Sequence, residues 1–407
     1  MTTTLLRGGN LFVGTSKLRR ADLLISAEGI LEIADRIDPS DDRVDEVVEL
    51  NGKAVLPGLI DSHVHLLVDG VDEMQRLHEP YSTPYYRATK VLRETLERGI
   101  TTVRDAGGAD QGLKHALATG LIEGPQVLTA VTILGQTGGH SDGMSPCGVD
   151  LSLMPATPGR PSGIVNGPEE MRTRVRELQR AGADVIKICT TGGVLSPSDD
   201  PRHSQFAMDE IEMCVREAAV TGLGVMAHAQ GPAGVLNAVR GGVRSVEHGI
   251  YATDECWDAM LERGTWLVPT LIAPVALLRA IDGGAKVSPT VKQKASDAVT
   301  QHMVNVRKAV NAGVRIAMGT DAGVFPHEYS LAELSLMEEA GLEPHEVIEA
   351  ATISAAELLG LGDRGRIEVG MRADVIVVDG DPFDFDGFAD RVLRVFQAGS
   401  QRVSREL

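Results

Sequence analysis

Short apolar runs alternate with amphipathic stretches through the middle of the chain. Several of the amphipathic stretches end at glycine, which commonly stops a helix. Strand-length apolar runs separated by helical periods predict consecutive βα units and a parallel sheet. There are eight such runs: Gly58–Leu66, Thr101–Asp105, Gln126–Leu134, Asp184–Cys189, Gly224–His228, Ser245–His248, Thr265–Thr270 and Val314–Thr320.

The stretches between these runs have the period of helices. Eight strand–helix units in roughly 250–300 residues favour a distorted (β/α)8 TIM barrel, whereas an open doubly wound sheet usually has fewer strands. We therefore predict an α/β protein with a barrel over residues 57–361. The clearest helical stretches are Glu169–Ala181, Asp209–Thr221, Ala233–Arg240 and Thr253–Arg263.

Both ends of the chain lack this alternation. They contain β-rich runs separated by Gly, Asp and Pro, and they show little helical periodicity. Since the two ends share a character that the middle lacks, we predict one small β-sandwich domain formed by residues 1–56 together with residues 362–407.

Composition and charge narrow the classes of partner. The chain has 407 residues, of which 43% are hydrophobic and only 3% aromatic, so a large and mainly aliphatic core is expected. The formal net charge of −18 argues against nucleic-acid and anionic-membrane binding, which need basic surfaces. Neither nucleic acid nor an anionic membrane is therefore an expected partner.

Cysteines and apolar segments bear on the compartment. Cys147, Cys189, Cys214 and Cys256 are widely spaced, which makes a disulfide framework or a zinc–thiolate cluster improbable. The first residues lack the pattern of a signal peptide, and apolar runs stay below the about 18 residues of a membrane span. We expect a soluble, cytoplasmic protein.

The ends of the apolar runs carry residues that bind metals. His63 and His65 close the first run, and residues two apart on a strand point to the same face, so this pair could hold one metal ion. Active sites of such barrels lie at the carboxyl ends of the strands. Four more candidates occupy or end later runs, namely Lys187, His228, His248 and Asp321.

Each candidate also has an ordinary structural interpretation. A single histidine at a strand end often makes only a structural hydrogen bond, and Asp321 after Thr320 could cap a helix. Lys187 is harder to explain in this way, because an unpaired ammonium is costly to bury and needs a partner or a chemical change. Six such residues at one end of one predicted barrel favour a metal centre.

These residues resemble the amidohydrolase superfamily of binuclear metal-dependent hydrolases over nearly the whole chain. The segment Gly370-x-x-Ala373-Asp374 is typical of its returning β domain. The branch with imidazolonepropionase-like proteins, bacterial prolidases and Xaa-Arg carboxypeptidases is similar at Lys187–Val194, Asp199–Pro201 and Gly319–Gly323.

The resemblance implies a complete site with two divalent metal ions. His63 and His65 would hold one metal, and His228 and His248 the second. Lys187, carbamylated on its side-chain nitrogen, would bridge both. Asp321 would ligate the first metal and act as general base and then acid. Nitrogen and oxygen ligands suit zinc, with manganese, cobalt and iron as alternatives.

Substrate contacts are expected in the loops. His140 lies in the loop after the third run and could hydrogen-bond the substrate or merely stabilise the loop. Gln230, two residues after His228, stands where dipeptidase-like relatives commonly have a substrate-binding tyrosine, which weakens the transfer of peptide specificity. Tyr251 is a further candidate. Weaker ones are Arg202, His203 and His327.

The resemblance implies that the partner is a small-molecule substrate, a dipeptide or an N-acyl amino acid, whose carbon–nitrogen amide bond is hydrolysed by a metal-bridging hydroxide. Hydrolysis of a cyclic amide, a carbamate or a urea on the same centre is the alternative, and deamination or decarboxylation also occurs in the superfamily. A non-catalytic scaffold is a third interpretation. The presence of all six candidate metal ligands argues against it. A homo-oligomer is plausible.

Overall fold

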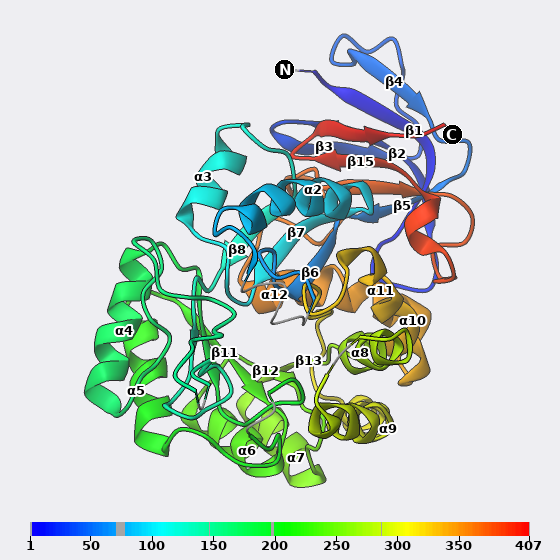
Figure 1. Ribbon diagram of the computed structural model, residues 1–407. Coiled ribbons are helices and arrows are strands. Elements are labelled where there is room, and N and C mark those ends of the chain that lie inside the picture. The colour runs from blue at the N-terminus through cyan, green and yellow to red at the C-terminus, as the bar shows by residue number, and fades with distance from the viewer. Residues whose placement is uncertain (1, 71–77, 146, 197–198, 286, 407) are drawn as a thin grey trace.

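The computed structural model describes residues 2–70, 78–145, 147–196, 199–285 and 287–406. Parallel strands occupy its middle, helices lie outside them, and a sheet formed by both ends of the chain sits at one side (Figure 1). This is the barrel-type α/β arrangement that the alternating pattern predicts.

Two parallel sheets form the inner layer. The first has the order β6 (Leu59–Val64), β7 (Ile100–Asp105), β8 (Gln126–Thr129). The second runs from β9 to β13 in chain order, with its strands all parallel. Its members are β9 (Ile133–Leu134), β10 (Val185–Cys189), β11 (Gly224–Ala229), β12 (Ser245–His248) and β13 (Trp266–Val268).

Seven of the eight apolar runs contain these strands, and two runs differ from the expectation. The third run is split into β8 and β9, because Val131 between them adopts a left-handed backbone with φ of 65°. The eighth run makes an isolated parallel bridge from Ile316 to Leu267 of β13, and Ala322, two residues after the run, makes another to Val64 at the end of β6. It therefore closes the ring between the two sheets without forming a regular strand.

The helices begin and end where the local sequence allows. Proline opens α4, α6 and α9, and glycine in the left-handed region follows α6, α7, α9 and α12. The helices of the described residues are α2 (Thr83–Glu97), α3 (Gln111–Ala118), α4 (Pro168–Arg180), α5 (Met208–Ala219), α6 (Pro232–Gly241), α7 (Asp254–Arg263), α8 (Ile272–Asp282), α9 (Pro289–Ala312), α10 (Ala332–Glu339), α11 (Pro344–Ala350) and α12 (Ile353–Leu359), with 3-10 turns η1 (His327–Tyr329) and η2 (Phe388–Arg391).

The two ends of the chain combine in one eight-stranded sheet, with both termini beside it (Figure 1). Its order is β16-β15-β14-β5-β1-β2-β3, and β4 pairs with β1. The joining of the two ends is thus confirmed; the sandwich arrangement and the boundaries at residues 56 and 361 stay predictions. The strands are β1 (Thr4–Leu11), β2 (Arg19–Ser26), β3 (Gly29–Ala34), β4 (Glu46–Glu49), β5 (Ala54–Pro57), β14 (Val375–Val378), β15 (Val392–Gln397) and β16 (Ser400–Ser404).

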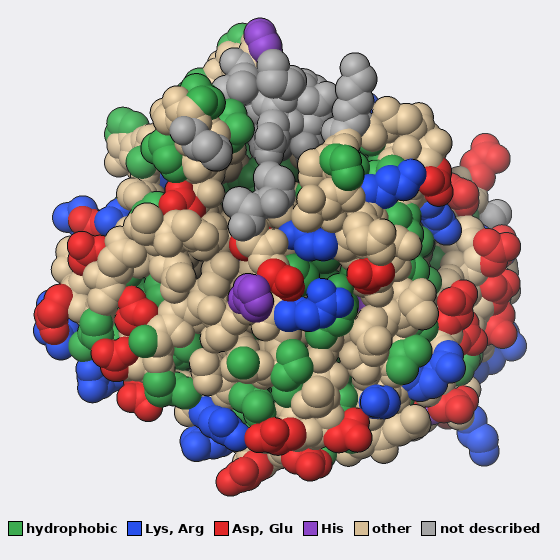
Figure 2. All heavy atoms as spheres, turned by 60° about the horizontal axis from the view of Figure 1, so that its bottom comes forward, with side chains coloured by type: hydrophobic (Ala, Val, Ile, Leu, Met, Phe, Trp, Pro, Cys, Tyr) green, Lys and Arg blue, Asp and Glu red, His purple; other side chains and the backbone are tan. Residues whose placement is uncertain are grey.

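The core is mainly aliphatic, as the scarcity of aromatic residues indicates, and its largest buried side chain is Trp257. Cys147 is exposed, the other three cysteines are buried, and all four are free thiols. Acidic and basic side chains intermix over the face shown in Figure 2. Among the described residues, every helix is too short or too polar to cross a bilayer.

Candidate metal centre

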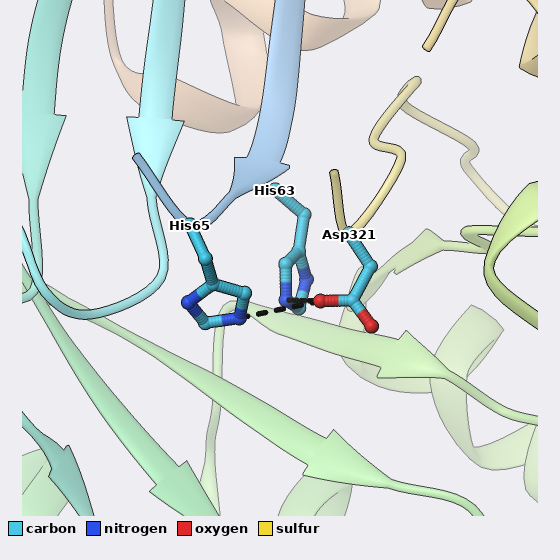
Figure 3. A group of neighbouring side chains, drawn as sticks. All are labelled: His63, His65 and Asp321. Atoms are coloured by element: carbon cyan, nitrogen blue, oxygen red, sulfur yellow. Dashed lines mark ion pairs between the residues drawn. The ribbon is translucent and has the colours of Figure 1, made fainter. Parts of the chain in front are cut away.

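His63 and His65 meet Asp321 at the end of β6. The Nε2 atoms of the two histidines lie 3.3 and 3.2 Å from the same carboxylate oxygen, Oδ1 of Asp321 (Figure 3). Asp321 has a φ of 64°, and its backbone N–H donates to the carbonyl oxygen of His63 at 2.7 Å. The three side chains each offer a ligand atom within 4.8 Å of the others, so this group could hold a metal ion.

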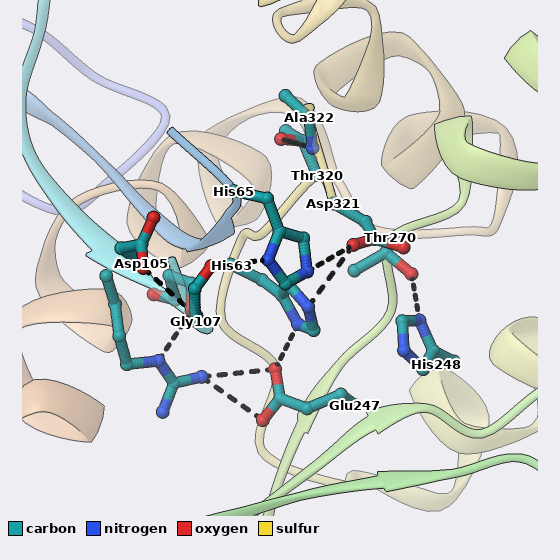
Figure 4. Close-up of polar contacts among 12 residues, drawn as sticks. His63, His65, Asp105, Gly107, Glu247, His248, Thr270, Thr320, Asp321 and Ala322 are labelled. Atoms are coloured by element: carbon teal, nitrogen blue, oxygen red, sulfur yellow. Dashed lines mark hydrogen bonds and ion pairs between the residues drawn. The ribbon is translucent and has the colours of Figure 1, made fainter. Parts of the chain in front are cut away.

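Hydrogen bonds at Nδ1 hold three of the histidine rings (Figure 4). His63 Nδ1 lies 2.7 Å from Glu247 Oε2, and His65 Nδ1 lies 3.0 Å from the carbonyl oxygen of Gly107. His248 Nδ1 lies 2.7 Å from the Thr270 hydroxyl. Because Nδ1 is occupied in each ring, Nε2 is left for a metal, the pattern usual for metal-binding histidines.

His228 and His248 lie next to this triad but are not part of the same ligand group. Their ring centres are 4.7 Å apart, and that of His248 is 5.2 Å from His63. His228 points Nε2 at the Gly192 carbonyl oxygen, 3.0 Å away, which leaves its Nδ1. Burial lowers the pKa of both histidines well below the usual range and keeps them neutral, as metal binding requires.

Asp321 is held as a carboxylate. Burial alone would raise the pKa of this group, but the neighbouring charge of His63 and the hydrogen bonds from His63 and His65 lower it well below its ordinary value. The second carboxylate oxygen points away from both rings (Figure 3). Asp321 therefore presents one carboxylate oxygen to both histidines and turns the other away from them.

Lys187 is buried in the middle of β10, with 2% of its surface exposed. Among the residues that the structure describes, its ammonium nitrogen makes neither a hydrogen bond nor an ion pair. Burial lowers the pKa of Lys187, although the negative charge of Glu247 acts to raise it. A lysine in this state is a better nucleophile than an ordinary one and is open to chemical modification.

A buried ion pair under His63 escaped the sequence prediction. Arg104 on β7 and Glu247 on β12 are both buried, and Arg104 Nη2 lies 3.1 Å from each Glu247 carboxylate oxygen. Burial would raise the pKa of Glu247, but Arg104 and His63 lower it to about 2. The argument applied to Lys187, a charge inside an apolar strand, would have found both residues.

Two further aspartates fix the backbone around the triad, and the sequence prediction missed them too. Asp105 accepts backbone N–H groups of Leu66, Gly107 and Ala109 at 2.8 to 3.0 Å. Asp61 accepts from the Thr320 hydroxyl at 2.7 Å, and burial raises the pKa of Asp61 to about 7. Their signal in the sequence is again an aspartate at or inside an apolar run.

His140 reaches the site from its loop. Its ring stacks on that of His228, with ring centres 4.4 Å apart, and its Nδ1 lies 3.2 Å from Asp199 Oδ2. A Cβ atom on Gly193 would come within 2.0 Å of the His140 ring, so glycine is required there. The expectation that His140 lies near the centre agrees with this geometry; a substrate contact stays a prediction.

Gln230, Tyr251 and Arg202 form a second polar group beside the metal ligands. Among the described residues, Gln230 Oε1 and the Tyr251 hydroxyl are buried without a hydrogen-bond partner. The Arg202 guanidinium lies 4.4 Å from the centre of the Tyr251 ring. By contrast, His203 is exposed, whereas His327 is buried and its Nε2 lacks a partner among the described residues.

Comparison with known proteins identifies the family. The model of the amidohydrolase family matches residues 54–402. The chain belongs to the amidohydrolase family. It is 33% identical over 400 residues to ochratoxinase from Aspergillus niger, covering 94% of this chain and 82% of that protein. The resemblance seen in the sequence is thus confirmed, and this amidohydrolase is an enzyme that hydrolyses carbon–nitrogen bonds.

Solved structures agree with the family and the fold. A prolidase complexed with N-methylphosphonate-L-proline has 34% identity and a TM-score of 0.90, with each chain fully covered. A Xaa-Pro dipeptidase with bound methionine in the active site has 33% identity and a TM-score of 0.90, covering 98% of this chain and 99% of that one. The prolidase branch indicated by the sequence is therefore represented among the structures most similar to this amidohydrolase.

Proposed function

We propose that this amidohydrolase cleaves the amide bond of a dipeptide or an N-acyl amino acid at a centre for two divalent metal ions. The observation that carries the proposal is the convergence of His63, His65 and Asp321, with His228 and His248 beside them. Five histidine and carboxylate side chains at one end of the inner layer make a donor set for a hard or borderline cation.

The surroundings of Lys187 show whether the site could accept a second metal ion. A buried ammonium without a partner is costly, whereas a carbamylated side chain is an anion that two cations would neutralise. In the proposal His63, His65 and Asp321 hold one ion, His228 and His248 hold the other, and modified Lys187 joins them. When bound, the ions would polarise the scissile carbonyl and lower the pKa of a water molecule; zinc is our first choice.

The protein's own groups would then orient the substrate and move the proton. Asp321, kept ionised by its histidine neighbours, takes the proton of the attacking water and returns it to the departing nitrogen. His140, held by Asp199, would hydrogen-bond the substrate next to the reaction centre. Gln230 and Tyr251 offer unpartnered polar atoms, and Arg202 a positive charge for a substrate carboxylate.

Similarity to enzymes acting on amides of amino acids supports this substrate class. Structures with a proline phosphonate and with methionine are among those most similar to this chain. Gln230, in place of the expected tyrosine, argues for a preference different from that of the dipeptidases. A tyrosine hydroxyl donates and accepts through one oxygen, whereas a glutamine amide accepts through its oxygen and donates through a separate nitrogen, so the two side chains present different hydrogen-bonding geometry to a substrate.

A substrate panel on metal-loaded protein tests the proposal. The panel contains dipeptides, N-acyl amino acids, ring amides, carbamates and phenylureas, with release of the amine measured by chromatography and bound metal by mass spectrometry. We expect turnover of at least one open-chain amide of an amino acid and none by Asp321→Asn with the same metal content. Arg93→Gln, a change of an exposed charge on α2, is the matched control and should keep full activity.

Other outcomes would redirect the proposal. If only ring amides, carbamates or ureas were turned over, the same metal centre would act on the alternative substrate class. Full activity of metal-loaded Asp321→Asn would remove the proton-transfer role. Less than one metal ion per chain after supplementation, with no turnover, would instead support a non-catalytic scaffold.

A further inference from the structure

Helix α9 carries a row of buried polar residues on the side that faces the site. Lys294, His302 and Asn305 are 9%, 1% and 3% exposed, and their spacing of eight and three residues places them on one side of the helix. Each donates to a backbone carbonyl in a loop that leaves the inner strands. We call these three residues the α9 donor row.

Lys294 holds the loop that follows β10. Its ammonium donates to the carbonyl oxygens of Gly193 at 2.7 Å, Ser196 at 2.6 Å and Asp199 at 2.9 Å. The Asp199 side chain lies 3.6 Å from the same ammonium and 3.2 Å from His140 Nδ1. A single buried charge thus fixes both the loop and the carboxylate that orients the His140 ring.

His302 and Asn305 hold the turn that follows β12. His302 Nε2 lies 2.9 Å from the carbonyl oxygen of His248, and Asn305 Nδ2 donates to that of Ile250 at 2.9 Å. His248 itself has a φ of 74°, a left-handed conformation that a residue with a side chain adopts only when its surroundings enforce it. Both donors contact carbonyl groups in the turn that contains this residue.

Helix stability alone does not require these residues. Apolar side chains would fill the same buried positions without the desolvation that a lysine, a histidine and an asparagine suffer. Neighbouring buried positions of the same face, such as Ala295, Ala298 and Ala309, are small and apolar, so the polar row departs from its own surroundings. The polar side chains of the donor row instead hold two loops in place.

We propose that the α9 donor row positions the site, with Lys294 acting through Asp199 to hold His140, and His302 and Asn305 acting through the backbone to hold His248. None of the three residues touches the reacting atoms, so all are positioning residues. The catalytic part of this inference rests on the proposed function; the structural part does not.

Hydrogen exchange read by mass spectrometry tests the structural part without any substrate. Lys294→Met keeps the length of the side chain and removes its three donors. We expect it to speed exchange at least tenfold in peptides covering residues 188–196 and 199–205, and to leave peptides covering residues 245–252 unchanged. Asn305→Leu should show the opposite pattern. Lys292→Met, an exposed lysine on the same helix, is the control and should change neither.

A double-mutant cycle on an active substrate tests the catalytic part. We expect Lys294→Met to lower kcat/KM about 10- to 100-fold, mainly through KM, at unchanged metal content. In a His140→Ala background the same change should have little further effect, since the ring that Lys294 holds is gone. An equal loss in both backgrounds would make Lys294 a general structural residue and overturn its positioning role.

The two readouts separate the possible failures. If the wild-type enzyme turned over no substrate of the panel, the proposed function would be wrong. The hydrogen-exchange result, in which each variant changes only its own loop, would still support the positioning role. If either variant lost protection from hydrogen exchange equally in both loops, the proposal for the donor row would be wrong, whatever the activity. If Lys294→Met does not fold, Lys294→Gln, which retains donors, replaces it in both measurements and is expected to show the same pattern with smaller changes.

Discussion

Lys187 is the single residue whose surroundings most restrict the chemistry. It is buried on β10, has no partner among the described residues, and lies within the influence of Glu247, Asp321 and Arg104. A structural lysine at such a position would be paired, because desolvation of an unpaired ammonium costs several kcal/mol. The carbamylation that we propose for Lys187 would remove this cost by changing the charge of the side chain.

Replacing Lys187 by Met should separate stability from function. The variant removes a desolvated nitrogen and keeps the volume, so we expect its free energy of unfolding without metal to equal or exceed that of the wild type. Metal content should fall below two ions per chain, and kcat/KM by at least about a hundredfold. Urea unfolding and metal analysis check this, and native mass spectrometry should show one added carboxylate on the metal-loaded wild type only.

Asp199 should contribute stability that depends on pH. Burial would raise the pKa of this carboxyl, but the hydrogen bond and charge of His140 lower it to about 2, below its usual 3.8. A lowered folded-state pKa gives stability that is present above pH 3.8 and is lost as the pH falls toward 2. Asp199→Asn should cost about 1–2 kcal/mol near pH 5, and this cost should shrink as the pH falls to 2.

Urea unfolding of both proteins between pH 2 and pH 5 measures that difference. Asp386→Asn, at an exposed position of the C-terminal region, is the control and should give a flat difference over the same range. A constant gap between wild type and Asp199→Asn at every pH would show that the carboxylate charge plays no part.

At the scale of elements, Glu333 on α10 determines where α8 begins. Its two carboxylate oxygens accept the backbone N–H groups of Leu271 and Ile272, at 2.9 and 2.7 Å, in a fully buried setting. The first N–H groups of a helix have no partner within the helix, so Glu333 supplies it from a distant element. This contact joins the start of α8, just after β13, to α10, which follows the eighth run.

Glu333→Leu should leave two buried N–H groups unpaired. We expect a loss of about 2–4 kcal/mol in the free energy of unfolding, from about 1–3 kcal/mol for each unsatisfied group less the apolar burial gained. Glu338→Leu, at an exposed position of the same helix, should change stability by less than about 0.5 kcal/mol. Similar values for the two variants, measured by urea unfolding, would contradict the capping role.

The elements also show what could be predicted from the sequence. Apolar runs located the seven that contain strands, because most of these strands are buried on both faces and their sequences are therefore continuously apolar. The break in the third run and the irregular eighth segment escaped, since both depend on left-handed residues, Val131 and Asp321, that tertiary contacts impose. The histidines that we propose as metal ligands were recognised by their place at the ends of apolar runs.

The partners that orient the ligands could not be found in the same way. Asp199 and Thr270 lie far along the chain from the residues they hold, His140 and His248, and only folding brings them together. Lys294 sits in a helix whose pattern gives no sign of its three carbonyl partners. These contacts depend on which loops come together in the fold, and the periodicity of the sequence does not show this.

At the scale of the whole molecule, the site spans a seam in the inner layer. His63 and His65 belong to the sheet of β6, β7 and β8, whereas Lys187, His228 and His248 belong to the sheet of β9 to β13. Between β13 and β6 the sheets are joined by the eighth segment, which carries Asp321 and makes isolated bridges only. Metal ions held by ligands from both sheets would therefore add links across a seam where the backbone pairs irregularly, through hydrogen bonds such as that from the Ser62 N–H to Met318 and that from the Ala317 N–H to Leu267.

Metal binding should consequently stabilise the fold as a whole and protect both sides of this seam. At a free zinc concentration of a hundred times the dissociation constant, linkage predicts a gain of about 2.7 kcal/mol for each independent site. We expect a higher unfolding midpoint with zinc, reversal by a chelator, and slower hydrogen exchange at the ends of β6 and β12. The terminal sheet should exchange at the same rate with and without metal below the unfolding transition, because its strands hold no ligand. His63→Ala should lose most of the gain; an equal gain in that variant would place the stabilising metal elsewhere.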